Sequence, residues 1–341
     1  MRILLIGGSG FIGSHVARTL TAQGHDVVVF HRGTTRLRNQ IVGDRRRLGD
    51  YADALRRLAP DVVVDLILSS GRQASELMQQ LRGVTGRVVA LSSADVYRAC
   101  GVLHGFEPGP LEPVPLTERS ALRTKLQTYP PDRIKMLQRV FGWLDEEYDK
   151  IPVEREILGD AALPGTVLRL PMVYGPGDPL RRFLSVIKRI DDQRPAILFE
   201  EGYARWRSPR GYVENVAAAI ALAATSDRAA GRVYNVGDAG SLTELEWAEL
   251  IAAAAGWTGR FVTLPVDRMP PNLVLPGNTE QHWTIDTTRI REELGYREPV
   301  AQADAIRRTI DWERANPSDS SAHVFDYDAE DAALRQHERS R

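Results

Sequence analysis

The sequence predicts an α/β fold in which a doubly wound parallel sheet is followed by a smaller C-terminal lobe. Three observations support this prediction. Short apolar runs alternate with segments of helical periodicity, a glycine-rich turn joins the first run to the first helix, and a turn-rich segment at residues 173–179 follows the strand expected at 165–170. A chain of 341 residues can bury a large core, as one unit or as two closely packed lobes.

The first unit spans residues 1–31 and is the most informative stretch. An apolar run at residues 3–6 predicts a buried strand, helical spacing follows from Phe11, and residues 26–30 predict a second strand. Between strand and helix stand Gly7, Gly8, Gly10 and Gly13. Glycines in this context let the backbone approach a pyrophosphate at a helix N-terminus. The unit therefore predicts a Rossmann-type dinucleotide site, and the alternative is a tight turn in another α/β protein.

The end of the second predicted strand indicates which dinucleotide binds. NAD sites place a carboxylate there for the ribose 2′-hydroxyl, whereas this sequence has His31 and Arg32. A guanidinium suits a 2′-phosphate, so NADP is expected, with NAD as the second choice. The alternative is that Arg32 is a solvated loop charge. Asp44 and Arg45 follow a third short apolar run and are expected near the adenine.

The alternation continues through the next segments of the chain. Helices are expected at residues 51–58 and 73–81, and strands at 61–68 and 86–93. Ligands of such sheets bind beyond the carboxyl ends of the strands. The serines at these ends, Ser69, Ser70, Ser92 and Ser93, are therefore expected at the active edge.

Residues 98–143 interrupt the pattern with many prolines and glycines. An insertion of this length is either a lid or a disordered segment. We favour a lid, because aromatic residues such as Tyr129 and Trp143 give it groups that can pack. A helix is expected inside it, near residues 133–143.

The second half of the chain is expected to contribute a smaller substrate lobe. Helices are expected at residues 152–158, 183–190, 213–224 and 242–255, and strands at 165–170 and 232–236. The expected division is a dinucleotide-binding domain at 1–170, a substrate lobe at 171–312 interleaved with it, and a polar tail at 313–341. Residues 316–341 are expected to be loosely held, and the alternative is that Val324, Phe325 and Tyr327 dock on the protein.

Composition excludes several classes of protein. The net charge of −1 argues against a dedicated nucleic-acid binder, and the single cysteine, Cys100, against a disulfide framework. No apolar run approaches the length of a membrane span, and the first strand begins at Met1, so a cytoplasmic protein without a signal peptide is expected. No spacing of His, Asp or Glu suggests a metal site.

Six segments together resemble one known family. They are GGSGFIG at 7–13, LSSADVY at 91–97, LRLPMVYGPGDP at 168–179, RGYVENVAAAI at 210–220, YNVG at 234–237 and DTTRIREELGY at 286–296. The chain resembles the extended short-chain dehydrogenase/reductases, the NAD-dependent epimerase/dehydratase family, over residues 1–312. The resemblance implies hydride transfer between a substrate carbon and nicotinamide, with a tyrosine exchanging a proton with the substrate oxygen.

Carried over to this sequence, the resemblance makes Ser93 the residue that hydrogen-bonds the substrate oxygen and Tyr148 the acid/base. The family's lysine, four residues after the tyrosine, is replaced by Pro152. The nearest cation is Lys150, which would not share a helix face with Tyr148. Pro152 suggests that the helix starts late and leaves Tyr148 in the preceding loop, from which Lys150 would reach the nicotinamide ribose. Lys150 is therefore the third candidate catalytic residue.

The resemblance and the strand positions also give candidate binding residues. Those for the cofactor are Gly7, Gly10, Phe11, Ile12, Gly13, His31, Arg32, Asp44, Arg45, Leu66 and Pro171. Those for the substrate are Asp95, Arg169, Tyr174 and Arg210. The two arginines favour a phosphate-bearing substrate, and the alternative is that both are structural. Family membership further implies a homodimer.

Two functions follow from this reading. The first is an NAD(P)-dependent oxidoreductase or epimerase acting on a sugar-nucleotide-like or other small substrate. The second is a dinucleotide-binding protein without efficient redox activity that acts as a regulator or binds RNA. The missing lysine motivates the second hypothesis, whereas Ser93 and Tyr148 favour the first.

Overall fold

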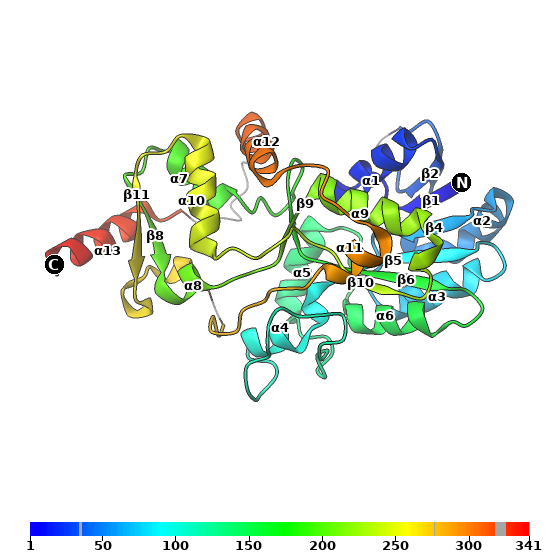
Figure 1. The fold of residues 1–341 in the computed structure, drawn as a ribbon, viewed down its shortest axis with the longest axis horizontal. Coiled ribbons are helices and arrows are strands. Elements are labelled where there is room, and N and C mark those ends of the chain that lie inside the picture. The colour runs from blue at the N-terminus through cyan, green and yellow to red at the C-terminus, as the bar shows by residue number, and fades with distance from the viewer. Residues whose placement is uncertain (34–35, 276, 318–324, 341) are drawn as a thin grey trace.

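The computed structural model describes residues 1–33, 36–275, 277–317 and 325–340, which form two lobes (Figure 1). The larger lobe contains a seven-stranded sheet in the order β10-β6-β5-β4-β1-β2-β3. Its strands are β1 (Arg2–Ile6), β2 (Asp26–His31), β3 (Gln40–Val42), β4 (Val62–Asp65), β5 (Arg87–Ser93), β6 (Gly165–Leu170) and β10 (Val233–Asn235). All neighbours pair in parallel and the chain winds outward from β1 in both directions. The doubly wound α/β sheet is thus confirmed.

Helices cover both faces of this sheet (Figure 1). The helices α1 (Phe11–Ala22) and α9 (Val213–Thr225) pack on one face, and α3 (Gly71–Leu81) and α6 (Lys150–Gly159) on the other. Side chains of β1 alternate between the two layers. Ile3 and Leu5 join the core beneath α1, and Leu4 and Ile6 join the opposite core. A strand covered on both faces must be apolar at every position, which explains its unbroken apolar run.

The smaller lobe is built around two parallel strands, β8 (Ala196–Glu200) and β11 (Arg260–Leu264). The helices α7 (Leu184–Asp191), α8 (Glu201–Arg205) and α10 (Glu244–Ala255) surround them. The pair β7 (Met172–Tyr174) and β9 (Arg210–Tyr212) connects the lobes. Helix α10 begins at Thr243, whose hydroxyl accepts the N–H of Glu246 in a capping box. Three further helices are α2 (Ala52–Leu58), α11 (Thr288–Leu294) and α12 (Gln302–Ala315).

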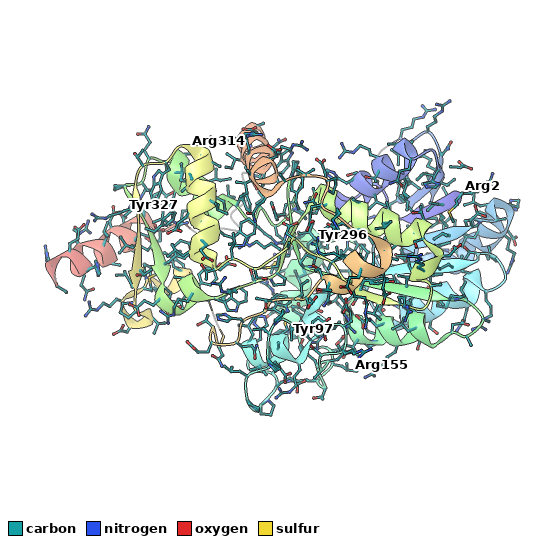
Figure 2. All side chains as sticks on the ribbon, viewed as in Figure 1. Arg2, Tyr97, Arg155, Tyr296, Arg314 and Tyr327 are labelled. Atoms are coloured by element: carbon teal, nitrogen blue, oxygen red, sulfur yellow. The ribbon has the colours of Figure 1, made fainter. Side chains whose placement is uncertain are left out.

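The C-terminal residues differ from the loosely held tail that the sequence suggested. Helix α13 (Tyr327–Arg339) packs on the smaller lobe. Figure 2 labels Tyr327 at the smaller lobe. Glu330 is buried and accepts from Arg189 Nε at 3.0 Å. The Arg194 guanidinium lies 4.6 Å from the ring centre of Tyr327. These contacts hold the helix, so a loosely held tail is wrong for residues 327–339, and the alternative that Tyr327 docks agrees with the structure. Residues 318–324 lie outside the described part of the chain.

The insertion at residues 98–143 is packed and contains two helices, α4 (Arg98–Leu103) and α5 (Pro131–Val140). The Glu107 carboxylate accepts the N–H groups of Thr124 (2.6 Å) and Lys125 (2.9 Å). Leu116 is buried, and its N–H bonds to the carbonyl of Thr284 at 2.8 Å. The insertion is therefore tied to the body of the protein, which argues against the disordered alternative.

Candidate active site

The glycine turn after β1 is too crowded for side chains. Gly7 has φ +84°, and a Cβ on Gly13 would lie 2.3 Å from the Gly7 carbonyl oxygen. Helix α1 starts directly afterwards with Gly10 at its N-cap, and no side chain caps it. Its first N–H groups and the positive end of its dipole are therefore available to an anion.

A cavity of about 350 Å³ opens beside this turn. Ten of the eleven expected cofactor residues line it: Gly7, Gly10, Phe11, Ile12, Gly13, His31, Arg32, Asp44, Arg45 and Leu66. The eleventh, Pro171, is not among its lining residues. Residues scattered over the first 66 positions thus meet at one site, at the carboxyl edge of the sheet.

The end of β2 presents a cation to this cavity. His31 is buried and contacts the first residue of β3, because its Nε2 lies 2.8 Å from Oε1 of Gln40. Arg32 is exposed and donates from Nη1 to the carbonyl oxygen of Gly142 at 3.3 Å. The guanidinium therefore stands at the mouth of the cavity, bridging β2 and the insertion.

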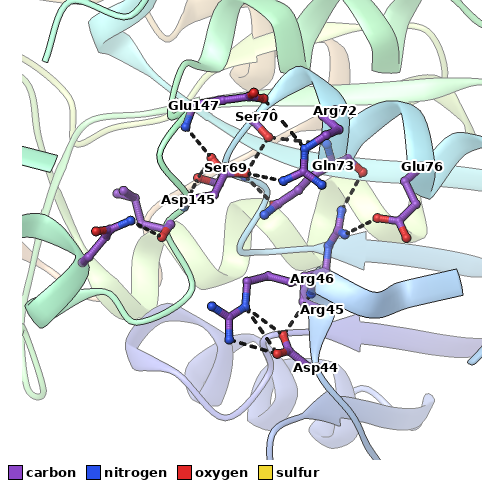
Figure 3. Close-up of polar contacts among 12 residues, drawn as sticks. Asp44, Arg45, Arg46, Ser69, Ser70, Arg72, Gln73, Glu76, Asp145 and Glu147 are labelled. Atoms are coloured by element: carbon purple, nitrogen blue, oxygen red, sulfur yellow. Dashed lines mark hydrogen bonds and ion pairs between the residues drawn. The ribbon is translucent and has the colours of Figure 1, made fainter. Parts of the chain in front are cut away.

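Beyond β3, the two neighbouring arginines differ in their partners (Figure 3). Arg45 is buried, bonds to Asp65 Oδ2 at 2.7 Å and donates to the Gln73 carbonyl, so its guanidinium holds the fold together. Arg46 is exposed and pairs with Asp44 at 3.0 Å. The hydrogen bond from Arg46 lowers the pKa of the Asp44 carboxyl.

Tyr148 lies in the loop before α6, as the sequence suggested. The helix begins at Lys150, and the side chain of Asp149 caps it. Pro152 falls in the first turn, where its missing N–H costs nothing. It packs against Gly71 at the start of α3, since a Cβ on that glycine would lie 2.7 Å from the proline Cβ. The usual lysine position is thus used for packing between α3 and α6.

Lys150 is buried at the carboxyl ends of two central strands. Its Nζ donates to the carbonyl oxygens of Leu68 and Leu91, the latter at 3.2 Å. The same Nζ lies 5.6 Å from the ring centres of both Tyr148 and Trp143. Burial lowers the pKa of this ammonium group to about 8. The geometry thus places a cation against the ring of Tyr148 despite the missing lysine.

Tyr148 is surrounded by groups that keep its hydroxyl protonated. Its ring meets the edge of Tyr129, with ring centres 5.6 Å apart, and the Tyr129 hydroxyl donates to Asp95 Oδ2 at 3.2 Å. Burial, followed by the nearby carboxylates of Asp95 and Asp149, raises the pKa of Tyr148 well above its ordinary value. Asp95 is itself buried, and burial raises the pKa of its carboxyl.

The two serines that end β5 have different surroundings. The Ser93 hydroxyl is half-buried and accepts the N–H of Asp95 at 3.2 Å. Ser92 is buried and donates to Glu154 Oε1 at 2.6 Å. Ser93 is therefore the serine that remains partly accessible at the strand end, whereas Ser92 fixes α6 to the sheet.

Arg169 is wrongly placed by the sequence as a substrate-binding residue. It is buried, and two of its nitrogens bond to both Glu154 oxygens, at 2.9 and 2.7 Å. It also donates to the hydroxyl of Tyr97 at 3.0 Å, and that hydroxyl bonds to Asn235 at 2.6 Å (Figure 2). The charge is neutralised inside the fold, so the structural alternative holds.

Arg210 is likewise neutralised. Its Nη2 pairs with Glu244 Oε2 at 2.5 Å, and its guanidinium lies 5.0 Å from the ring centre of Trp247. Both charged partners are largely buried. The expectation of a free charge that grips a phosphate is corrected, because the compensating carboxylate comes from the start of α10, which sequence reading did not connect with Arg210.

Tyr174 also differs from its expected role as a substrate contact. Its side chain is fully buried and stacks on Phe183, with ring centres 5.1 Å apart. Its hydroxyl donates to Asp238 at 3.3 Å. The residue thus belongs to the aromatic core between the lobes, and the apolar surroundings explain why its polar tip needs a buried acceptor.

The insertion contributes residues that sequence reading did not place in the site. Phe141, Gly142 and Trp143 line the cavity beside the glycine turn, and Tyr129 lies against Tyr148. For the three aromatic residues of this set, the aromatic side chain was the only signal in the sequence. It indicated that they pack but did not indicate against which residues. Contacts made by such a long insertion depend on the tertiary structure alone.

Two further observations concern metal ligands and membrane-spanning helices. Within the described residues, no three His, Cys, Asp or Glu side chains are grouped so as to hold a metal ion. Among the helices of that same part of the chain, none is long and apolar enough to cross a membrane.

Comparison with curated proteins gives relatives along most of the chain. The chain is 28% identical over 276 residues to 2'-dehydrokanamycin reductase of Streptomyces kanamyceticus, covering 78% of this chain and 70% of that protein. It is 25% identical over 342 residues to 2-alkyl-3-oxoalkanoate reductase of Stenotrophomonas maltophilia, covering 90% and 98%. Both relatives are reductases by name.

Solved structures share the fold. MoeE5 in complex with UDP-glucose and NAD superimposes with a TM-score of 0.65 at 22% identity, over 93% of this chain and 100% of that one. Residues 3–101 and 153–237, more than half of the chain, match the NAD dependent epimerase/dehydratase family. The gap between the two matched segments contains most of the insertion. The chain therefore belongs to the NAD dependent epimerase/dehydratase family.

Proposed function

We propose that this chain is a reductase that uses a reduced nicotinamide dinucleotide, NADPH before NADH, to convert a carbonyl group into an alcohol. One observation carries the proposal. Tyr148 lies against the buried ammonium of Lys150, which bonds to the backbone of β5 two residues before Ser93. A proton donor and a cation thus lie side by side near the carboxyl end of β5, the strand that ends at Ser93, and ligands of such sheets bind beyond these strand ends.

The residues present fit a dinucleotide. A Cβ on Gly13 would crowd the turn, and the first N–H groups of α1 have no side-chain cap, as a pyrophosphate site requires. NADPH is favoured because the end of β2 carries Arg32 at the cavity mouth, where an NAD site would carry a carboxylate. The ion pair between Asp44 and Arg46 places a second guanidinium on the same rim.

When bound, the reduced nicotinamide supplies the hydride that adds to the carbonyl carbon. The Tyr148 hydroxyl gives its proton to the carbonyl oxygen, which receives the electron pair of the C=O π bond. Ser93 donates a hydrogen bond to the same oxygen and so orients the substrate. Lys150 stabilises the tyrosinate that remains, until water returns the proton.

Tyr148 is in the protonation state that reduction requires. Burial and the carboxylates nearby raise the pKa of this hydroxyl, so it holds its proton at neutral pH, and the ammonium of Lys150 is proposed to offset this rise when the proton leaves. Oxidation of an alcohol would require the tyrosinate first. The names of the two reductases with which the chain aligns agree with this direction.

The proposed substrate is a small carbonyl compound, and a nucleoside diphosphate sugar is the less favoured choice. MoeE5 was solved with UDP-glucose, but the arginines expected to hold a phosphate here, Arg169 and Arg210, are both paired with buried glutamates. Replacing a buried partner by an anionic ligand would leave a glutamate unpaired, which is costly.

The test is NADPH oxidation with a panel of ketones and 4-keto sugar nucleotides, for the wild-type chain and Tyr148→Phe. We expect turnover of a ketone by the wild type and a loss of about 1,000-fold in Tyr148→Phe, which lacks the proton donor. Turnover by Tyr148→Phe equal to that of the wild type would contradict the assignment of Tyr148.

The second candidate is a dinucleotide-binding protein without redox activity. It is favoured by Pro152 at the lysine position and by the commitment of Lys150 Nζ to two backbone carbonyls. Dinucleotide binding without oxidation of NADPH by any carbonyl compound would support it. RNA binding that weakens steeply with salt would identify the RNA-binding form of this candidate.

A further inference from the structure

The insertion reaches the cavity through residues 140–143, which we call the strap. All four strap residues line the cavity, facing a rim made by the glycine turn and the ends of β2 and β3. The strap therefore forms a wall that the dinucleotide-binding unit alone would lack. The family match stops at residue 101 and resumes at 153, so this wall comes from the unmatched part of the chain.

The strap connects the two ends of the proposed cofactor site. At one end, the Gly142 carbonyl accepts from Arg32, the cation at the end of β2. At the other end, the ring of Trp143 lies 5.6 Å from Lys150 Nζ, beside Tyr148. A dinucleotide that reaches from Arg32 to Lys150 would pass along the strap for most of its length.

The strap is held in place by hydrogen bonds within the chain. Its turn is closed by backbone bonds, from Phe141 N–H to the Leu137 carbonyl (2.6 Å) and from Leu144 N–H to the Phe141 carbonyl (2.9 Å). Next to it, the Asp145 carboxylate accepts from the hydroxyls of Ser69 (3.1 Å) and Ser70 (2.6 Å) at the start of α3 (Figure 3). These bonds anchor the strap to the segment that joins β4 to α3.

The surface of the strap suits a flat aromatic ligand. The rings of Phe141 and Trp143 lie 5.8 Å apart at an angle of 46°, and both are partly exposed on the cavity side. Aromatic side chains bind the faces of bases through packing that does not depend on their identity. On the opposite side, the helix N-terminus suits a pyrophosphate, so the cavity presents both surfaces that a dinucleotide needs.

We propose that Phe141 and Trp143 are cofactor-binding residues: they pack on the bound dinucleotide and make the insertion a wall of its site. This inference rests on the proposed function, since it takes the dinucleotide as the occupant. It assigns to the insertion a role in holding the cofactor, and it predicts that losing either ring weakens cofactor binding without preventing folding.

The experiment is calorimetric titration of the full chain with NADPH and NADH. The variants are Phe141→Ala and Trp143→Ala, and the control is Leu111→Ala, which removes an exposed apolar side chain from the same insertion outside the cavity. We expect each cavity variant to raise the Kd about ten-fold and the control to leave it within about two-fold. Thermal unfolding of each variant reports whether the fold is kept.

A conservative variant covers the case in which an alanine variant fails to fold. The difference in fluorescence between the wild type and Trp143→Phe gives the emission of Trp143, and NADPH should quench it because the nicotinamide absorbs at that wavelength. Unchanged or tighter binding in both alanine variants, or no quenching of Trp143, would overturn the role of the strap while leaving the reductase proposal intact. Binding of neither dinucleotide by the wild type would overturn both.

Discussion

The buried Lys150 gives a quantitative prediction. Its pKa falls from 10.5 to about 8 in the folded protein, because the ammonium is desolvated. A shift of this size corresponds to about 3 kcal/mol by which folding is penalised when the lysine is charged. Between pH 8 and pH 10.5 the unfolded chain holds a proton that the folded chain has released, so the free energy of unfolding rises with pH.

The perturbation is Lys150→Met, which keeps the length of the side chain and removes the titrating group. The wild type should gain about 2–3 kcal/mol of stability relative to this variant between pH 7 and pH 10. Urea unfolding of both proteins at pH 7, 8, 9 and 10 measures this difference, and other titrating groups cancel because they are common to both. A difference that is constant or falls with pH would refute the burial of a charged Lys150.

Three further predictions concern other parts of the molecule. Arg32→Ala should raise the Kd for NADPH about ten-fold and leave that for NADH nearly unchanged in calorimetric titration, because only NADPH carries the 2′-phosphate; equal losses would contradict this role. Gly13→Ala places a Cβ 2.3 Å from the Gly7 oxygen, so binding of both dinucleotides should be lost, and retention of wild-type affinity would show that the turn tolerates a side chain. Burial raises the pKa of Glu313 to about 7 beside Arg181. Between pH 4.5 and pH 7 the folded chain then holds a proton that the unfolded chain has released. The free energy of unfolding of the wild type should therefore fall by about 1–2 kcal/mol relative to that of Glu313→Gln from pH 5 to pH 8, measured by urea unfolding. The same pH dependence in both proteins would contradict the raised pKa of Glu313.

Local patterns were sufficient to predict the larger lobe. The apolar runs that form β1, β2 and β6 are covered on both faces of the sheet. Because a strand in such a position is apolar along its length, a continuous apolar run predicts a central strand of the sheet. The glycine turn was predicted with its residues, because a Cβ on Gly13 would meet the backbone of Gly7 and Gly8, which lie only a few positions away in the chain. The late start of α6 followed from Pro152, whose fixed φ and missing N–H are local properties.

Pairings across the chain were not predictable in this way. Arg169 and Arg210 were interpreted as binding residues because a single arginine in a sequence does not reveal its partner. The partners, Glu154 and Glu244, come from helices that only the tertiary structure brings near. The packing of helix α13 was missed for the same reason. Its sequence is polar, and its buried residue Glu330 pairs with Arg189 of α7 in the smaller lobe.

The insertion shows most clearly which contacts of the site could not be predicted from the sequence. Its aromatic residues suggested that it packs, but neither the contact of Tyr129 with Tyr148 nor the position of Trp143 beside the cavity follows from spacing. Both contacts depend on where a long segment returns to the sheet, which loop length and composition do not determine.

The central claim is that Tyr148 protonates a carbonyl oxygen while hydride passes to the carbonyl carbon from a bound cofactor. The most direct test uses NADPH deuterated at the transferable C4 position with a ketone that the wild type turns over. We predict deuterium on the carbinol carbon of the product, and a Tyr148→Phe variant that binds NADPH normally but forms this product about 1,000-fold more slowly. A product without deuterium, or equal rates in the two proteins, would contradict the account.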